Sequence, residues 1–95
     1  MSAYMIVTIE EMVDAEAMQH YAANVDAVVK QFDGRYLVPR GTTRAIEGSW
    51  DPGMIALIEF PSTDRILEYY ESEEYRPLRD LRHRSAKTSI VITED

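Results

Sequence analysis

Cysteine is absent from this 95-residue sequence, and the absence excludes disulfide bonds, thiolate metal sites and a cysteine nucleophile. Glycine and proline number only four each, so no glycine-rich phosphate loop and no flexible linker is indicated. The longest apolar runs reach about five residues, far short of a membrane span. The N-terminus has neither the basic region nor the apolar segment of a signal peptide. We therefore expect a cytoplasmic protein with no metal, no cofactor and no membrane contact.

Positive charge is also in short supply. Ten Lys and Arg residues stand against seventeen Asp and Glu, which gives a net charge of −7. A surface of this sign disfavours nucleic acid as a partner. The hydrophobic share of 45% is that of a globular chain, and the length suits one domain, residues 1–95.

The first half of the chain predicts a strand, a helix and a second strand. Residues 3–10 are rich in β-branched and aromatic types and predict the first strand. Asp14 is typical of a helix N-cap, and an apolar stripe at steps of three and four follows it as far as residue 32. Gly34 is expected at the position after the helix C-cap. A strand over 36–38 follows, with a possible extension over 42–46.

The second half predicts a strand, a broken helix and a final strand. A turn at 47–53 precedes a strand over 54–60. Ser62 or Thr63 is expected to cap the next helix, and Ser72 to cap a further helical turn. Pro77 fits only the first turn of the helix that follows, because it lacks an N–H. The last strand is expected over 87–93.

The order of these elements is β-α-β-β-α-β, with the second helix broken. This order predicts an α+β fold of the ferredoxin-like class, an antiparallel sheet with helices on one face. The strand segments MIV, MIALI and IVI, however, are apolar on both faces, whereas a half-exposed strand should alternate. We therefore expect a homodimer in which two sheets pack face to face as a dimeric α/β barrel.

Half of the positive charge is concentrated in residues 75–87, YRPLRDLRHRSAK. Acidic residues precede these bases, so the longer segment 71–87, with four acids and five bases, is close to neutral and matches the dipole of a helix. Asp80 stands four residues from both Arg76 and Arg84 and could pair with either. Arg82 differs from its neighbours because it falls on the apolar side of the helix, in step with Tyr75 and Leu78.

Two interpretations of Arg82 remain open. A buried arginine needs a partner, and Glu59 is a candidate because it interrupts an apolar strand. Alternatively, the guanidinium is held ready for a carboxylate or similar ligand anion. A pocket in which Arg82 is strained or unpaired would favour ligand binding or catalysis, whereas a filled seam with an Arg82–Glu59 pair would favour a purely structural role.

Other candidate residues surround this one. Tyr75, Tyr36 and Trp50 are predicted to line a pocket between sheet and helices, and Trp50 could instead pack in the dimer seam. His20 is the one plausible general base near neutral pH, although its place off the helix stripe suits a surface residue. His83, between two arginines, is expected to face solvent.

Three functions are compatible with these residues. The first is a homodimer that binds a small anionic or aromatic molecule through Arg82, Tyr75, Trp50 and Tyr36. The second is a cofactor-free enzyme, a monooxygenase or isomerase, with His20 as its base. The third is a dimerisation module without chemistry.

Three runs of sequence carry a family resemblance: FDGRYLVPRG, EGSWDPGMIALIEFPS and EYYESEEYRPLRDLRHRSA. Together they resemble the bacterial family called domain of unknown function 1330, over nearly the whole chain. The resemblance implies a dimeric α/β-barrel fold and no agreed activity. The wider dimeric barrel group includes cofactor-free monooxygenases, lactone isomerases and ligand-binding modules, so the resemblance leaves the function open.

Overall fold

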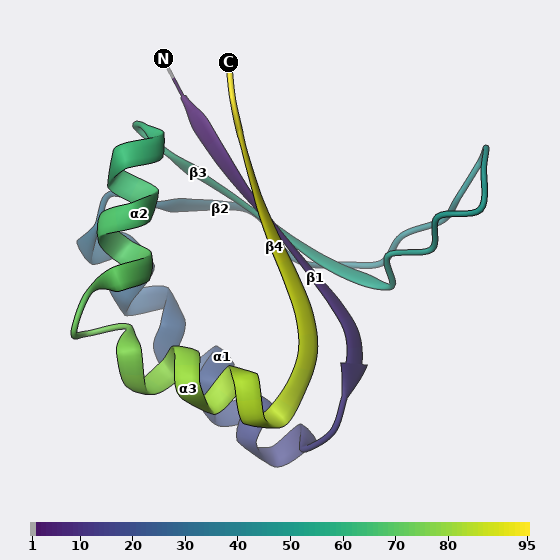
Figure 1. Ribbon diagram of the computed structural model, residues 1–95, viewed down its shortest axis with the longest axis horizontal. Helices are drawn as coiled ribbons and strands as arrows, with labels where there is room; N and C mark the ends of the chain where they lie inside the picture. The colour runs from purple at the N-terminus through teal and green to yellow at the C-terminus, as the bar shows by residue number, and fades with distance from the viewer. Residues whose placement is uncertain (1) are drawn as a thin grey trace.

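The computed structural model describes residues 2–95, and Figure 1 shows a twisted sheet with its helices on one side. The elements run β1 (Ala3–Met12), α1 (Ala15–Gln31), β2 (Arg35–Gly41), β3 (Met54–Phe60), α2 (Thr63–Glu71), α3 (Arg76–Ser85) and β4 (Ala86–Glu94). The sheet is antiparallel throughout, in the order β2-β3-β1-β4. This is the predicted ferredoxin-like arrangement.

The helix boundaries follow local signals in the sequence. The Asp14 carboxylate accepts a hydrogen bond from the Ala17 N–H, and Ser62 caps α2 in the same way. Ser72 ends α2, and its hydroxyl accepts the Tyr75 N–H ahead of α3, as predicted. Pro77 lies in the first turn of α3, where its missing N–H costs nothing.

Two local predictions are wrong. Asp33, and not Gly34, takes the left-handed conformation after α1, with φ of 67°. Gly34 is required for space instead, because a Cβ there would lie 2.6 Å from a Val29 methyl carbon and 2.7 Å from the Phe60 ring. Residues 42–46 do not extend β2, which instead runs through Pro39 to Gly41 with register shifts. Proline is tolerated because β2 is an edge strand.

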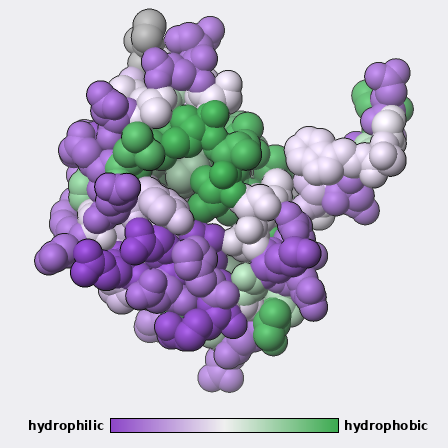
Figure 2. Space-filling model, viewed as in Figure 1, coloured by the Kyte–Doolittle hydropathy of each residue, from purple (hydrophilic) through white to green (hydrophobic). Residues whose placement is uncertain are grey.

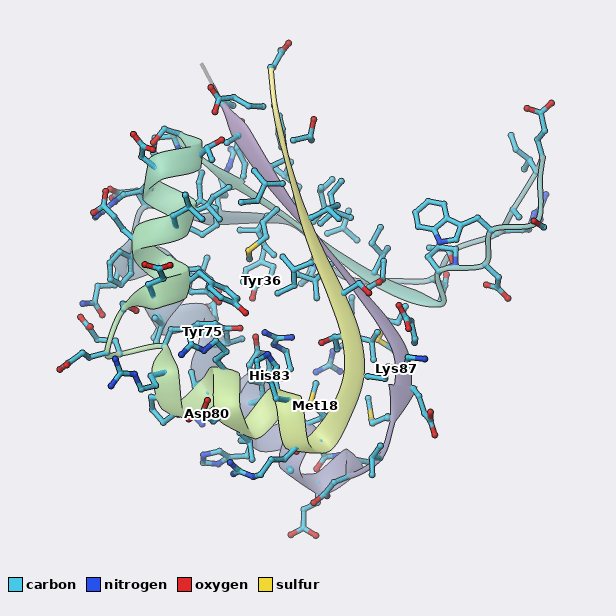
Figure 3. All side chains as sticks on the ribbon, viewed as in Figure 1. Met18, Tyr36, Tyr75, Asp80, His83 and Lys87 are labelled. Atoms are coloured by element: carbon cyan, nitrogen blue, oxygen red, sulfur yellow. The ribbon has the colours of Figure 1, made fainter. Side chains whose placement is uncertain are left out.

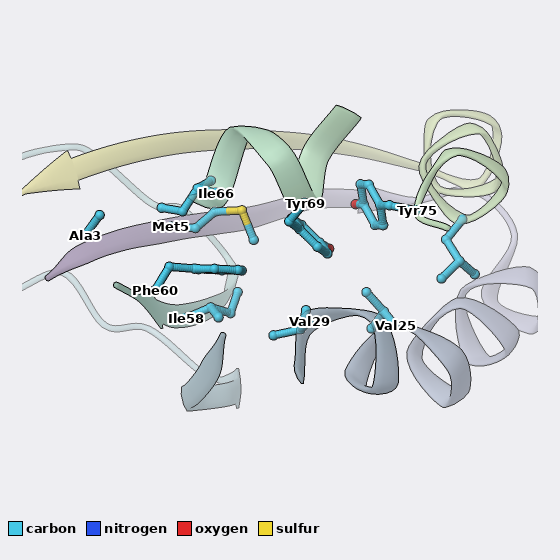
Figure 4. Packing of buried hydrophobic residues seen from close by; sticks show 10 residues of the cluster. Ala3, Met5, Val25, Val29, Ile58, Phe60, Ile66, Tyr69 and Tyr75 are labelled. Atoms are coloured by element: carbon cyan, nitrogen blue, oxygen red, sulfur yellow. The ribbon is translucent and has the colours of Figure 1, made fainter. Parts of the chain in front are cut away.

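The core lies between the sheet and the helices. Tyr69 of α2 is fully buried at its centre, with its ring centroid 4.4 Å from that of Tyr75 and 5.5 Å from that of Phe60. Figure 4 shows these rings meeting aliphatic side chains from β1, β3 and α1. Burying an aromatic side chain contributes about 2 kcal/mol or more, so these rings hold the helices to the sheet.

Within residues 2–95, no helix covers the opposite face of the sheet. Strand register places Ile6 of β1 beside Leu57 of β3 and Val91 of β4, and Leu57 beside Val38 of β2. An aliphatic row therefore crosses all four strands on this open face, and Val91 is 57% exposed. The prediction that the strands are apolar on both faces is confirmed.

The β2–β3 connection is the most extended part of the molecule. Figure 1 shows residues between β2 and β3 projecting away from the sheet as a long arm. Ile46 and Trp50 lie in this arm, and 92% and 70% of their respective surfaces are exposed. These are two of the most exposed large apolar side chains among the described residues.

Candidate functional site

A cavity of about 610 Å³ separates the sheet from α1 and α3. Its floor comes from the helix-facing side of β1, β3 and β4, including Val7, Ala56 and Ile90, which pair across the strands. Tyr36 and Tyr75 both line this space, and Figure 3 shows them near each other between the sheet and the helices. The wall is mainly apolar, with a few polar groups that converge, which is the usual composition of a small-molecule site.

Arg82 is the charged group deepest in this cavity, and only 3% of its surface is exposed. The spacing of α3 explains its position, because the buried residues of this helix are Leu78, Arg82 and Ser85, at steps of four and three. Its guanidinium donates from Nε to the Tyr75 hydroxyl at 3.3 Å and from Nη1 to Thr88 Oγ1 at 2.5 Å. Its Nη2 lies 3.4 Å from His83 Nε2.

No carboxylate lies within 4.0 Å of this guanidinium in the part of the chain that the structure describes. The predicted partnership with Glu59 is wrong. Glu59 pairs with Arg35 at 2.5 Å, and both lie on the open face of the sheet, whereas the adjacent Ile58 faces the helices. Alternation along a strand thus puts the sheet between Glu59 and Arg82.

Tyrosine oxygens replace a carboxylate around Arg82. Burial by itself would lower the pKa of Arg82, but the Tyr75 and Tyr21 oxygens outweigh this effect, so the pKa is raised and the group stays cationic. The Tyr21 and Tyr75 hydroxyls lie 2.7 Å apart and share one hydrogen bond. Burial and the contact with Tyr75 raise the pKa of Tyr21 far above its usual range, so its hydroxyl stays protonated.

Tyr36 adds a further hydroxyl group to the wall of the cavity. It faces the cavity from β2 beside Ile58, and Asp26 of α1 also lines this part of the wall. Burial raises the pKa of Tyr36 to about 12, and the negative charge of Asp26 adds to the rise. The Asp26 carboxylate itself is held by Lys30 at 3.1 Å. Tyr36 is therefore a hydroxyl donor or acceptor at neutral pH and not a base.

Methionine is concentrated in the apolar wall. All four methionines within residues 2–95 line the cavity: Met5, Met12, Met18 and Met54. Methionine is flexible and polarisable, and its sulfur makes favourable contacts with aromatic rings. Such a wall can adapt to a planar ligand more readily than a wall of branched side chains.

A second, smaller hollow of about 310 Å³ lies behind Arg82, between α2 and β4. Figure 2 shows the apolar side chains that gather around it. Leu67 and Ile92 border this hollow and are partly exposed, and Thr88 holds Arg82 from the same side. Arg82 lines both spaces, so its side chain forms part of the wall between them.

The structure brings together three of the predicted site residues, Arg82, Tyr75 and Tyr36. Trp50 lies on the projecting arm and His20 on the exposed side of α1, and neither lines the cavity of the single chain. His83 is exposed, as predicted.

Arg79 is only partly exposed, unlike most of the other charged residues of α3. It donates to the Tyr70 carbonyl at 3.0 Å and lies 5.2 Å from the centre of the Tyr70 ring. The predicted pairing of Asp80 with Arg76 or Arg84 is absent from the ion pairs of residues 2–95. Arg79 therefore ties α3 to α2, whereas Arg76 and Arg84 are exposed.

Tyr21 is the site residue that the sequence analysis missed. It stands three residues after Met18 and four before Val25, both buried, so the helical step could have placed it on the inner face. No sequence pattern predicts the hydrogen bond between Arg82 and Thr88, which forms because β4 folds back along α3. Among residues 2–95 no cluster of His, Asp and Glu is arranged to hold a metal ion, and no helix is long and apolar enough to cross a membrane.

The family described as Domain of unknown function (DUF1330) matches residues 2–95. A protein of unknown function from Rhodopseudomonas palustris has a similar structure, with a TM-score of 0.80 at 15% identity, over 99% of this chain and 82% of that one. A dimeric ferredoxin-like protein of unknown function from Jannaschia sp. CCS1 is similar over the whole of both chains, with a TM-score of 0.75 at 14% identity.

Some structural neighbours carry an activity in their names. One of them is a putative antibiotic biosynthesis monooxygenase from Caulobacter crescentus CB15, with a TM-score of 0.67 at 13% identity, over 99% of this chain and 89% of that one. No curated protein matches this chain. At these identities the similarities establish the ferredoxin-like fold alone.

Proposed function

This chain belongs to the DUF1330 family, and from its cavity we propose that it binds a small, largely apolar molecule that carries one negatively charged oxygen group. The observation that carries this proposal is Arg82, a buried cation without a carboxylate partner among residues 2–95, in the wall of a 610 Å³ cavity. A ligand anion would supply the missing negative charge.

Binding is favoured over the two alternatives. His20, the base predicted for a cofactor-free enzyme, does not line the cavity. A dimerisation module without chemistry would have no use for an open cavity around Arg82. Catalysis is a second candidate function, because the structural neighbours include a putative monooxygenase. The expected base, His20, is not among the residues that line this cavity.

The assembly that we propose is a homodimer formed through the open face of the sheet. Its support is the aliphatic row on that face and the description of the Jannaschia neighbour as dimeric. The projecting arm would then lie along the second copy, with Trp50 packed in the seam or over the partner's cavity. The site of action would be the cytoplasm, as the sequence predicts.

Calorimetric titration with benzoate tests the binding site, because benzoate combines an apolar ring with one carboxylate. Arg82→Gln should weaken benzoate binding about tenfold or more, since it removes a charge-assisted hydrogen bond. Arg84→Gln is the matched control: it removes the same charge from an exposed position on the same helix. Equal benzoate affinities in both variants would contradict the proposal.

Stability measurements on the same variants separate ligand recognition from a structural role. Arg82→Gln leaves no orphaned carboxylate behind, so its unfolding free energy should fall by only about 1 kcal/mol. A loss of about 3 kcal/mol or more would instead be the sign of a broken buried ion pair.

A further inference from the structure

The hydroxyls of Tyr21 and Tyr75 have one more hydrogen to donate than they have acceptors for. Tyr21 and Tyr75 bring two hydroxyl hydrogens, and a single hydrogen bond of 2.7 Å joins them. Arg82 is a donor only, so its contact with the Tyr75 oxygen consumes an acceptor and offers none. The second hydroxyl hydrogen has no acceptor among the hydrogen bonds of residues 2–95.

Adding Tyr69 to the count leaves the surplus unchanged. Its ring lies against that of Tyr75, and burial followed by the proximity of Tyr21 and Tyr75 raises its pKa far above the usual range. Each further hydroxyl brings one hydrogen and accepts one. A row of phenols in which one oxygen accepts from a guanidinium therefore has one O–H without an acceptor inside the row.

Arg82 also determines how strong this donor is. Because the guanidinium donates to the Tyr75 oxygen, it draws electron density from that hydroxyl and strengthens the hydrogen bond that the hydroxyl gives in turn. The charge thus reaches the cavity through a phenol. A carboxylate can accept two parallel hydrogen bonds from the Nε and an Nη of an arginine. In Arg82 the Nε hydrogen is already donated to Tyr75, so this bidentate arrangement is not fully available.

From this balance we infer that the cavity takes a single ionised oxygen attached to a flat unsaturated group, the oxygen of a phenolate or an enolate, at the free hydroxyl of the Tyr21–Tyr75 pair. The inference rests on the proposed function and narrows its ligand class. One oxygen atom suits one surplus O–H better than the two oxygens of a carboxylate do. The methionine wall suits the flat group to which that oxygen is attached.

The probe for this inference is 4-nitrophenol, whose neutral and ionised forms absorb at different wavelengths. Binding that favours the ion must lower the apparent pKa of the bound dye. We expect a fall of about one unit in the wild-type protein, since a charge-assisted hydrogen bond is roughly twice as strong as a neutral one. Titration of the dye with and without excess protein gives the shift directly.

Two phenylalanine variants, each of which deletes one oxygen from the same pair, make the test specific. Tyr21→Phe leaves Tyr75 in contact with Arg82 and with its hydroxyl hydrogen free, so most of the shift should remain. Tyr75→Phe cuts the link between Arg82 and the hydroxyls, so more than half of the shift should be lost. Arg84→Gln should behave like the wild type.

The outcomes distinguish this inference from the proposed function. An unshifted pKa of the dye bound to the wild type, or equal shifts in wild type and Tyr75→Phe, overturns the phenolate inference. If benzoate still binds in an Arg82-dependent way, the proposed function survives that result. Failure of both benzoate and 4-nitrophenol to bind overturns the two together. The wild-type shift is measured without any variant, so a folding defect in Tyr75→Phe does not remove the test.

Discussion

Ile6 and Val7 are neighbours in β1, yet they face two very different surfaces. Val7 points toward the helices and lines the cavity, where tyrosine hydroxyls and Arg82 supply polar contacts. Ile6 points the other way, into an aliphatic row that includes Leu57 and Val91 and that no helix covers. The helix-covered face therefore borders a cavity that contains the charged Arg82, and the open face is an apolar surface.

The difference shows what each face requires of a partner. A hollow with a buried cation and a surplus O–H needs a small ligand that brings negative charge. A flat aliphatic row with no polar group at its centre gains most from a second apolar surface, and a second copy of the same sheet provides one. The two surfaces can therefore be disrupted separately.

The largest effect is expected from a charge placed at the centre of the open face. Leu57→Asp puts a carboxylate between Ile6 and Val38 in the row. Burying it against a second sheet would cost several kcal/mol, so the dimer should dissociate at micromolar concentration. Sedimentation equilibrium should give a mass near 10.9 kDa for the variant and twice that for the wild type.

Val13→Asp is the control for this change, because Val13 is 70% exposed and lies outside the sheet. It introduces the same charge and should leave the dimer intact. Benzoate binding by Leu57→Asp should persist if the cavity is complete within one chain. A wild-type protein that sediments as a monomer would refute the assembly.

Side-chain periodicity predicted both the open face and the position of Arg82. The strands lack apolar–polar alternation, which predicted two apolar faces, and the steps of three and four in α3 predicted that Arg82 points inward. The predicted Glu59 pairing was wrong because Glu59 was taken only as an interruption of an apolar strand. It directly follows the buried Ile58, so it lies on the opposite face of the sheet. Periodicity assigns faces, but it does not show which neighbours fill the space between them.

The cavity itself could not be predicted for that reason. Its existence depends on how far α1 and α3 stand from the sheet, and the buried rings of Tyr69 and Tyr75, with centroids 4.4 Å apart, lie between these layers. Tyr21 joins Tyr75 across 54 positions of sequence. Such a contact follows from the packing of two helices and has no signature in either segment alone.

A smaller effect is expected from alkaline pH, and it acts on the helix-covered face. The pKa of Tyr36 is raised to about 12 by burial and by Asp26, so between pH 10 and pH 12 the unfolded chain releases a proton that the folded chain retains. The unfolding free energy should therefore fall as pH rises through this window, by at most about 1.4 kcal/mol per pH unit for this residue.

Urea denaturation at pH 9, 10 and 11 measures this dependence. Tyr36→Phe has no hydroxyl to titrate, so its loss of stability over the same range should be smaller by the share of one proton. Burial also raises the pKa of Tyr21 and Tyr69, so the unfolding free energy of both proteins should fall as the pH rises. Identical pH dependence in wild type and variant would mean that water reaches Tyr36 freely.

The smallest effect belongs to the ion pair at the edge of the open face. The hydrogen bond from Arg35 holds the pKa of Glu59 below its ordinary 4.5, so the pair contributes stability at neutral pH and loses it as pH falls through the folded pKa. Glu59→Gln should therefore lower the urea midpoint slightly at pH 7, and the difference from wild type should shrink at pH 3. Since Arg35 is 72% exposed, the effect in an isolated chain should be close to the limit of measurement. If the difference in urea midpoint grows with protein concentration, Glu59 lies at the rim of the dimer, because a second copy would then shield the ion pair from water. If the difference is independent of protein concentration, this edge of the sheet is not covered by a second copy.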